Sequence, residues 1–339
     1  MKYHKITTLI LKGSSLALAI VATTGLSHAA IITMTAGDSS TGNQTSFATG
    51  TNWTGGLAPS IDNTYVVAGA LQLVRTPADA STTLTFAGAS LTLSGTGAIA
   101  DGRLLYKGTG TAALQTTATI ANLILNGGSI ENGTNTNGST FIIAGGVVNV
   151  TAASSIMRSS QNGPIVINST LTGNGMLTVS GQVNNGASVT FNGANTYTGN
   201  LVVANPSGAG MILGATGSFT FAIGQSGINN NITGTGAAAS AAFNGGFVFD
   251  LTSAATTPGS SWTIVGASTL NETYDAVSFS GKDQTGTPWT QVNDVWTSGN
   301  GTYQFAEATG VVSVIPEPSS LLLGALGVMA VCGRRRRVA

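Results

Sequence analysis

Cysteine and histidine are almost missing from this chain of 339 residues. Its one cysteine, Cys332, and its two histidines, His4 and His28, all lie near the ends. The long central part therefore lacks the commonest general base, the thiolate nucleophile and the soft metal ligands. We expect no metal ion or other cofactor there, and stability cannot come from disulfide bonds.

Charged residues are equally scarce, at 7% of the sequence. Between residues 30 and 316, five basic residues stand against eleven acidic ones, which gives a net charge of −6. A body with so few cations cannot neutralise many phosphates, so we expect no nucleic acid and no anionic lipid as a partner. Glycine, threonine, serine, asparagine and alanine dominate, but steady short runs of Val, Ile, Leu and Phe argue against disorder.

The first 29 residues have the pattern of a secretory signal peptide. Three lysines precede an apolar stretch at residues 16–22, and small residues end the segment. The alternative, an ordinary N-terminal helix, would need a long amphipathic pattern that the segment lacks. We expect export through the Sec pathway and cleavage by signal peptidase between Ala29 and Ala30.

The C-terminal segment contains three features in order: a Pro-Glu-Pro element, an apolar run at residues 321–332 and a cluster of four arginines. The residues concerned are Pro316, Glu317 and Pro318, then Arg334, Arg335, Arg336 and Arg337. Twelve helical residues span only about 18 Å. That length is short against a hydrocarbon core of about 30 Å, so the run is a marginal membrane anchor. The arginines would keep this end on the cytoplasmic side of the inner membrane.

This order of features resembles the PEP-CTERM sorting signal of Gram-negative bacteria. The resemblance implies that an exosortase, a membrane protease, recognises Pro316, Glu317 and Pro318 and removes the helix and the basic tail. The body would then pass from transient anchoring in the inner membrane to the cell surface or the exopolysaccharide matrix. A C-terminal anchor that is never cut is the alternative.

Short apolar alternations of period two recur along the body between Gly and Asn turns, as half-buried strands require. In one region they follow each other every twelve residues, at Ile165/Ile167, Leu177/Val179, Val189/Phe191 and Leu201/Val203. A strand and a tight turn at fixed period favour a right-handed parallel β-helix, with two or three units in a coil of roughly 20 to 36 residues. A hairpin meander or a β-sandwich has a similar period and stays open as an alternative.

Two segments carry further resemblances. The Asn-Thr-Tyr-Thr-Gly turn at residues 195–199, followed by Leu-Val-Val, resembles the autotransporter-associated β-strand repeat, although Asn200 replaces its second glycine. That resemblance implies a parallel β-helix. The segment around Trp53 resembles the opening of large repeat proteins with the same C-terminal signal, and we expect Trp53 to cap the first coil rather than to bind sugar.

The composition changes near residue 245, after which three of the four tryptophans and many of the acidic residues occur. We therefore predict an all-β protein with a smaller C-terminal β-module and a single C-terminal hydrophobic helix. The predicted parts are a signal peptide (1–29), a β-solenoid (30–244), the β-module (245–313) and the sorting signal (314–339).

Without histidine or cysteine, an active site would depend on carboxylates, Ser with Lys, or Tyr with Arg. Two ionisable clusters are candidates: Asp275, Asp283 and Asp294 with Lys282, and Asp101 with Arg103 and Lys107. The first would suit glycoside hydrolysis if its carboxylates lay about 5 to 9.5 Å apart, and the second would imitate a β-helix polysaccharide lyase. Solvated loops and an ordinary charged turn are the simpler interpretations, and we expect no catalytic residue.

Tyr197, Trp289 and Trp296 are candidates for stacking on sugars if they are exposed. We expect a secreted, non-enzymatic surface or matrix protein whose polar faces meet extracellular polysaccharide through many weak hydrogen bonds. An adhesin with a defined partner is one alternative and predicts a contiguous apolar patch. A β-helix polysaccharide lyase or hydrolase is the other and predicts a groove where carboxylates converge.

Overall fold

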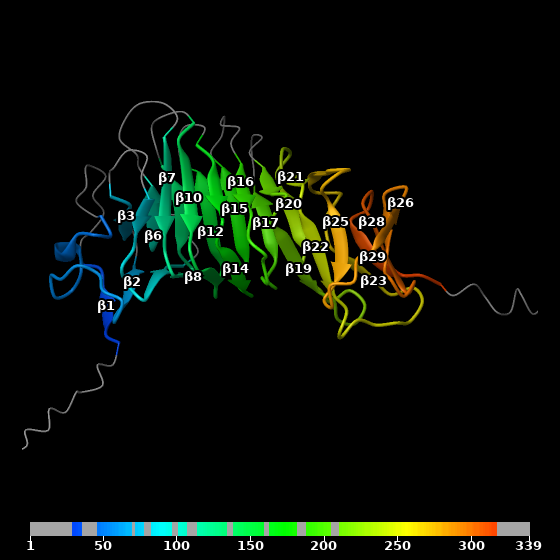
Figure 1. The fold of residues 1–339 in the computed structure, drawn as a ribbon, viewed down its shortest axis with the longest axis horizontal. Helices are drawn as coiled ribbons and strands as arrows, with labels where there is room; N and C mark the ends of the chain where they lie inside the picture. The colour runs from blue at the N-terminus through cyan, green and yellow to red at the C-terminus, as the bar shows by residue number, and fades with distance from the viewer. Residues whose placement is uncertain are drawn as a thin grey trace, which may run out of the picture.

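The computed structural model describes residues 29–35, 46–69, 72–77, 83–96, 101–106, 114–133, 138–158, 163–181, 188–204 and 210–316. Within them the chain forms an elongated stack of parallel β-coils that ends in a small antiparallel sheet (Figure 1). The first strand and the last strand lie at opposite ends of the long axis. The predicted all-β solenoid is confirmed.

Three parallel sheets form the walls of the solenoid, and we call them face 1, face 2 and face 3. Face 1 contains β1 (Ile31–Thr33), β2 (Thr64–Ala68), β5 (Ser90–Ser94), β8 (Asn122–Asn126), β11 (Val147–Val150) and β14 (Thr170–Gly173). Face 2 contains β3 (Leu73–Arg75), β6 (Arg103–Tyr106), β9 (Ser129–Asn132), β12 (Ser154–Arg158), β15 (Leu177–Gly181), β17 (Leu201–Ala204) and β20 (Ile232–Thr235). Face 3 contains β4 (Thr83–Thr85), β7 (Gln115–Thr119), β10 (Thr140–Ala144), β13 (Ile165–Ile167), β16 (Val189–Phe191), β18 (Met211–Leu213), β21 (Ser240–Phe243) and β24 (Asn271–Tyr274).

Face 1 continues beyond β14 through residues 194–198 into a three-stranded parallel sheet. The backbone N–H of Thr196 donates to the carbonyl of Leu171, and that of Ser218 donates to the carbonyl of Gly193. The sheet that follows contains β19 (Ser218–Ala222), β22 (Gly246–Asp250) and β25 (Ser280–Asp283). We treat it as the continuation of face 1.

The twelve-residue period in the sequence is half a coil. Its four apolar pairs lie alternately on face 3 and face 2, in β13, β15, β16 and β17. Ile165 pairs with Val189, and Leu177 pairs with Leu201, so one coil takes 24 residues here. The third strand of this coil, β14, lies between the first two pairs.

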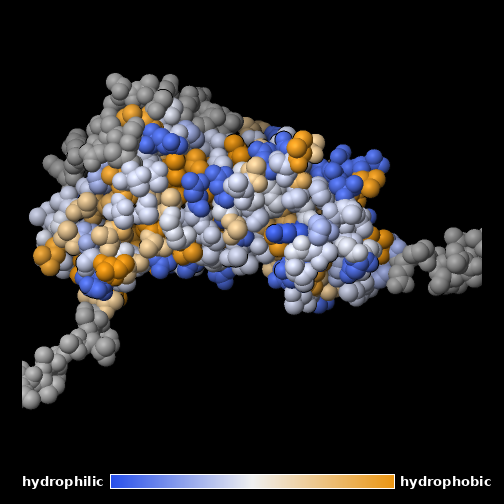
Figure 2. Space-filling model, in the orientation of Figure 1, coloured by the Kyte–Doolittle hydropathy of each residue, from blue (hydrophilic) through white to orange (hydrophobic). Residues whose placement is uncertain are grey.

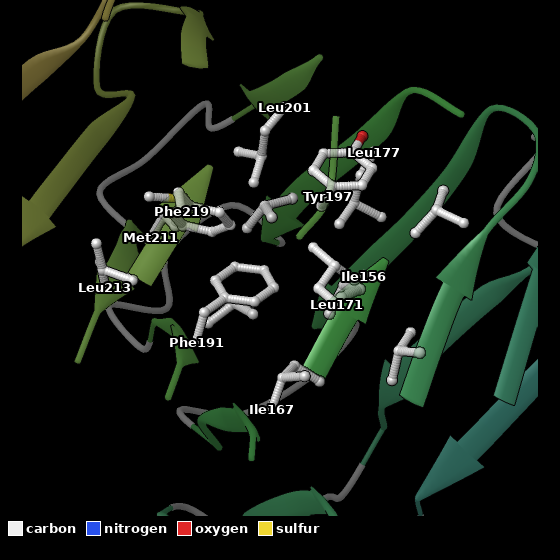
Figure 3. Close-up of a cluster of buried hydrophobic side chains, with 14 of the residues drawn as sticks. Ile156, Ile167, Leu171, Leu177, Phe191, Tyr197, Leu201, Met211, Leu213 and Phe219 are labelled. Carbon is white, nitrogen blue, oxygen red and sulfur yellow. The ribbon is translucent and has the colours of Figure 1, made fainter. Parts of the chain in front are cut away.

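Alternation of side chains along each strand sends every second residue into a shared interior. Figure 3 shows side chains from all three faces meeting there, among them Leu171 of face 1, Leu177 of face 2 and Phe191 of face 3. These three residues are fully buried. Equivalent positions of successive coils stack on one another, as in the pairings of Ile156 with Val179 and of Val179 with Val203.

Aromatic residues close the N-terminal end of the solenoid. Trp53, directly after the 3-10 turn η1 (Gly50–Asn52), is 1% exposed and packs edge-on against Tyr65, with ring centroids 5.0 Å apart. Its indole N–H donates to the carbonyl of Phe47. Trp53 is therefore a buried part of the cap, as expected, and no sugar can stack on it.

The C-terminal end is closed by a five-stranded antiparallel sheet. Its strands are β23 (Ser261–Thr263), β26 (Thr290–Val292), β27 (Val295–Thr297), β28 (Tyr303–Ala306) and β29 (Val311–Val314). The parallel ladders continue past residue 245, because Phe243 pairs with Tyr274 and Phe247 pairs with Gly281. The change in composition at residue 245 thus marks a change of core side chains, whereas the strand direction changes further along the chain.

Candidate functional site

The folded body ends next to the Pro-Glu-Pro element. Strand β29 lies between β23 and β28, and the N–H of Val314 donates to the carbonyl of Ser260 over 3.0 Å. The N–H of Ile315 donates to the carbonyl of Thr302 over 2.8 Å. Pro316 follows and has no N–H to continue such pairing. Ile315 is therefore the last residue before the Pro-Glu-Pro element whose backbone N–H is hydrogen-bonded to the body. We call the carbonyls of Ser260 and Thr302, which accept these two hydrogen bonds, the clamp, and the sequence did not reveal it.

A cleft of about 670 Å³ opens beside this exit point. Its lining comes from the loop at Thr256 and Pro258, the turn at residues 300–302 and the exit segment at residues 314–316. No described residue belongs to a helix long and apolar enough to cross a membrane. Glu317, Pro318, the apolar run at 321–332 and Arg334 to Arg337 lie outside the described residues.

The predicted N-terminal processing point also lies at an edge of the body. Ala29 and Ala30 are both exposed. The N–H of Ala30 donates to Oδ1 of Asn63, and its carbonyl accepts a hydrogen bond from the N–H of Thr64. Ala30 is thus the first described residue with such contacts, so cleavage between Ala29 and Ala30 would leave the folded part intact.

In the candidate cluster of Asp101, Arg103 and Lys107, Arg103 forms an ion pair between two coils of face 2. Nη1 of Arg103 lies 2.6 Å from Oε2 of Glu131, and the two side chains are 17% and 3% exposed. Asp101 accepts a hydrogen bond from the hydroxyl of Thr96, and Lys107 lies outside the described residues. The sequence missed Glu131, because a partner one coil away is 28 positions distant in the chain.

In the candidate cluster of Asp275, Asp283, Asp294 and Lys282, two carboxylates hold their own turns. Oδ1 of Asp275 accepts hydrogen bonds from Val277 and Ser278, and these bonds lower the pKa of Asp275. Oδ1 of Asp283 accepts bonds from Thr285 and Thr287. Burial would raise the pKa of Asp283, but the hydrogen bonds outweigh it and the pKa is lowered.

Asp294 lies in the β26–β27 turn with a φ of 62°, and Lys282 has an exposed side chain on β25. Among the described residues, no three His, Cys, Asp or Glu side chains gather as metal ligands. Burial raises the pKa of Glu307, whose Oε1 accepts a bond from the indole of Trp296. This carboxylate fixes a core tryptophan.

The three aromatic candidates for sugar stacking are buried. Tyr197, Trp289 and Trp296 are 2%, 4% and 8% exposed, so none of the three meets the condition of exposure on which sugar stacking depended. The hydroxyl of Tyr197 lies 2.5 Å from the carbonyl of Gly175 and 2.8 Å from that of Asn200. Trp289 stacks on Phe249 with ring centroids 4.4 Å apart. Their large apolar rings help to fill the interior.

Comparison with known families supports the C-terminal element. Residues 314–337 match the PEP-CTERM protein-sorting motif. No curated protein and no solved structure matches the chain, and the resemblance of residues 195–199 to autotransporter repeats stays a prediction. Exosortase processes proteins with this motif, which are exported to the cell surface. The motif starts at the last residue of β29. The chain thus carries a PEP-CTERM sorting motif at the C-terminal end of a β-solenoid body, and this motif implies processing by exosortase.

Proposed function

We propose that this protein is a non-enzymatic component of the cell surface or the extracellular matrix. Its signal peptide leads it through the Sec pathway, an exosortase-like protease frees it from the inner membrane, and its body associates with extracellular polysaccharide. The observation that carries the proposal is the position of the sorting motif, which starts at the last residue of β29. All described strands lie before Pro316, so everything from Glu317 onward can be removed without loss of a described strand.

The geometry of the exit favours cleavage of a folded substrate. Five residues, 316–320, separate Ile315 from the apolar run. Fully extended, these five residues span at most about 18 Å. Before cleavage the C-terminal sheet is therefore the part of the body nearest the membrane. The solenoid extends away from it along the long axis (Figure 1).

The surface favours a matrix role over the two alternatives. Figure 2 shows hydrophobic and hydrophilic residues interspersed on the face in view, whereas an adhesin for one partner would favour a contiguous apolar patch. Asp275 and Asp283 hold their own turns. The Arg103 guanidinium is paired with Glu131. These arrangements provide no support for a lyase or a hydrolase.

The test is the location and the terminal masses of the protein in its native cells. Surface wash, medium and inner-membrane fractions are compared, and the terminal peptides are identified by mass. A surface or released form that starts at Ala30 and ends within the Pro-Glu-Pro element supports the proposal. Intact protein through Ala339 in the inner membrane contradicts it.

A matched pair of variants assigns the cleavage to the motif. Glu317→Ala should leave the tail attached and move the protein to the membrane fraction. Glu272→Ala removes a carboxylate outside the motif, on the edge strand β24, and should be released as the unchanged protein is. Equal release of both variants would mean that the Pro-Glu-Pro element does not direct processing.

A further inference from the structure

The outward-facing side chains differ among the three faces of the solenoid. On face 1, strand pairing aligns a central row of outward residues, one from each successive coil. The row consists of Val66, Thr92, Ile124, Asn149, Thr172, Thr196, Thr220 and Val248. All eight are at least partly exposed, while their strand neighbours point into the core. Five of the eight side chains carry a hydroxyl or an amide.

Face 1 is uncharged over most of its length. From β1 to β19, including residues 194–198, its strands contain no Asp, Glu, Lys or Arg. Outward positions beside the central row add short polar side chains such as Ser94, Asn122 and Thr170. The first charges on this face are Asp250 of β22 and Lys282 of β25, near the C-terminal end.

The other two faces have different chemistry. Face 2 holds Arg75, Arg103 and Glu131, and its outward-facing residues Leu105 and Met157 are nearly buried. The central outward row of face 3 is aliphatic in its middle, where Ile142, Val166 and Ile212 lie around Thr190, and it has threonine toward its ends, at Thr83, Thr117 and Thr273. Face 3 is also uncharged from β4 to β21, so face 1 differs from it by a hydroxyl or an amide on four consecutive rungs of the central row, Asn149, Thr172, Thr196 and Thr220.

The groups on face 1 are held in order before any ligand binds. The side-chain amide of Asn126 donates to the hydroxyl of Ser94, and the hydroxyl of Thr151 donates to the side-chain Oδ1 of Asn126, which links three coils. The hydroxyl of Thr220 donates to the backbone carbonyl of Asn195. Threonine is β-branched and restricted at χ1. Binding to such a surface costs little side-chain entropy.

The dimensions of face 1 favour a polymer over a second copy of this chain. Seven successive rungs from β2 to β19, about 4.8 Å apart, and three outward residues per strand give a surface of roughly 30 by 13 Å. Two such surfaces face to face would bury only about 800 Å², below the roughly 1,200–2,000 Å² of a stable interface. A long chain that crosses several rungs gains affinity by repetition instead.

From these observations we infer that face 1, between β2 and β19, is a binding site for a neutral extended polysaccharide. Threonine, serine and asparagine hydrogen-bond the sugar hydroxyls, and the β-branched methyl groups contact the apolar faces of the sugar rings. The absence of charge disfavours polyanionic polymers, since no cation offsets the cost of removing their charges from water. This inference rests on the proposed matrix function and names the surface that performs it.

The test compares two threonines in equivalent places on different faces. Thr172 of β14 lies between Asn149 and Thr196 on face 1, and Thr190 of β16 lies between Val166 and Ile212 on face 3. The full chain, unchanged or as Thr172→Glu or Thr190→Glu, is expressed in its native cells and purified. Retardation is measured in native gels that contain hydroxyethylcellulose, dextran, galactomannan or the anionic polymer alginate. Circular dichroism checks that the variants remain folded.

We expect at least one neutral polysaccharide to retard the unchanged protein and Thr190→Glu equally. Thr172→Glu should bind it about tenfold more weakly or worse. Thr172→Val, which removes only the hydroxyl, should weaken binding by about two- to fivefold. This variant keeps the shape of threonine and so separates lost hydrogen bonds from a disturbed strand.

Several results would overturn the assignment. They are equal loss in both glutamate variants, no loss in Thr172→Glu, retardation by alginate alone, or no retardation by any neutral polymer. A dimer that Thr172→Glu dissociates in sedimentation equilibrium would assign face 1 to a second copy. None of these results changes the fractionation and terminal masses that test the proposed function, so the two can fail separately.

Discussion

The regular coils and the C-terminal sheet build their cores in different ways. Between β10 and β18 the pairings repeat one type of position, so that Phe141, Ile165, Val189 and Met211 stack in a single row. Around the C-terminal sheet no such row exists, and rings from strands of both directions meet at one cluster centred on Phe247. The coils thus spread their stability over near-identical neighbours, whereas the end concentrates it in a few aromatic residues.

Charged residues also have different roles in the coils and at the C-terminal end. The ion pair of Arg103 and Glu131 in the solenoid is nearly buried and links two coils. At the C-terminal end the carboxylates of Asp275 and Asp283 hold exposed turns. A solenoid therefore tolerates a charge where a partner is available one coil away, and the end uses charges to fix the irregular loops that a repeat does not need.

The largest expected effect is at the junction of the two regions. Phe247 is fully buried and contacts the rings of Phe243, Phe279 and Phe305. Phe247→Ala should lower the free energy of unfolding by about 3–5 kcal/mol, because a large cavity opens. Urea unfolding followed by tryptophan fluorescence measures it. A loss below about 1 kcal/mol would mean that the aromatic cluster does not hold the two regions together.

The next largest effect concerns the ion pair of the coils. Arg103→Ala leaves the Glu131 carboxylate, whose side chain is 3% exposed, without this partner, and should cost about 3 kcal/mol. Lys282→Ala, at an exposed position of β25, is the control and should change stability by less than about 0.5 kcal/mol. Equal effects in urea unfolding would contradict the difference in charge use between the two regions.

The sequence predicted the coils better than the end, for a physical reason. Alternation of period two and the turns with Gly and Asn depend on neighbouring residues, so the strands at Ile165, Leu177, Val189 and Leu201 could be predicted. Which wall each strand joins depends on the corners between them, and the alternation does not encode the corners. The strand at Thr170–Gly173 was missed for this reason, whereas the coil of two twelve-residue units, 24 residues long, lies within the predicted range.

The candidate site was predictable where it is linear in sequence and not where it depends on contacts across coils. The Pro-Glu-Pro element and the apolar and basic segments after it are contiguous, and the family match confirms them. The clamp at Ser260 and Thr302 brings together residues more than ten and fifty positions from the motif. Tyr197, Trp289 and Trp296 were candidates because a sequence gives the type of an aromatic side chain but not its burial.

A smaller effect compares one hydroxyl in each region. Tyr197 and Tyr303 both donate to backbone carbonyls, but the contact of Tyr197 with Gly175 is 2.5 Å and that of Tyr303 with Ala255 is 3.3 Å. Tyr197→Phe should cost about 1–2 kcal/mol, and Tyr303→Phe should cost less than about 1 kcal/mol. Thermal unfolding of both variants measures the difference. The reverse order would mean that the turn at residues 195–199 contributes less to the coil than the geometry indicates.

The smallest expected effects are two changes in melting temperature, both from carboxylates at the C-terminal end. They have opposite signs and depend on pH. The folded pKa of Asp283 is lowered below its ordinary value of 3.8, so the charged carboxylate stabilises the fold above that pH, and this contribution is lost as pH falls through the folded pKa. The folded pKa of Glu307 is raised mainly by burial, so its protonated form is favoured below 4.5 and that contribution is lost as pH rises. At pH 7, Asp283→Asn should therefore lower the melting temperature and Glu307→Gln should raise it, each by no more than about 2 °C. Both differences should shrink as the pH falls toward 3.8 and below, and shifts of the same sign at pH 7 would show that burial does not govern Glu307.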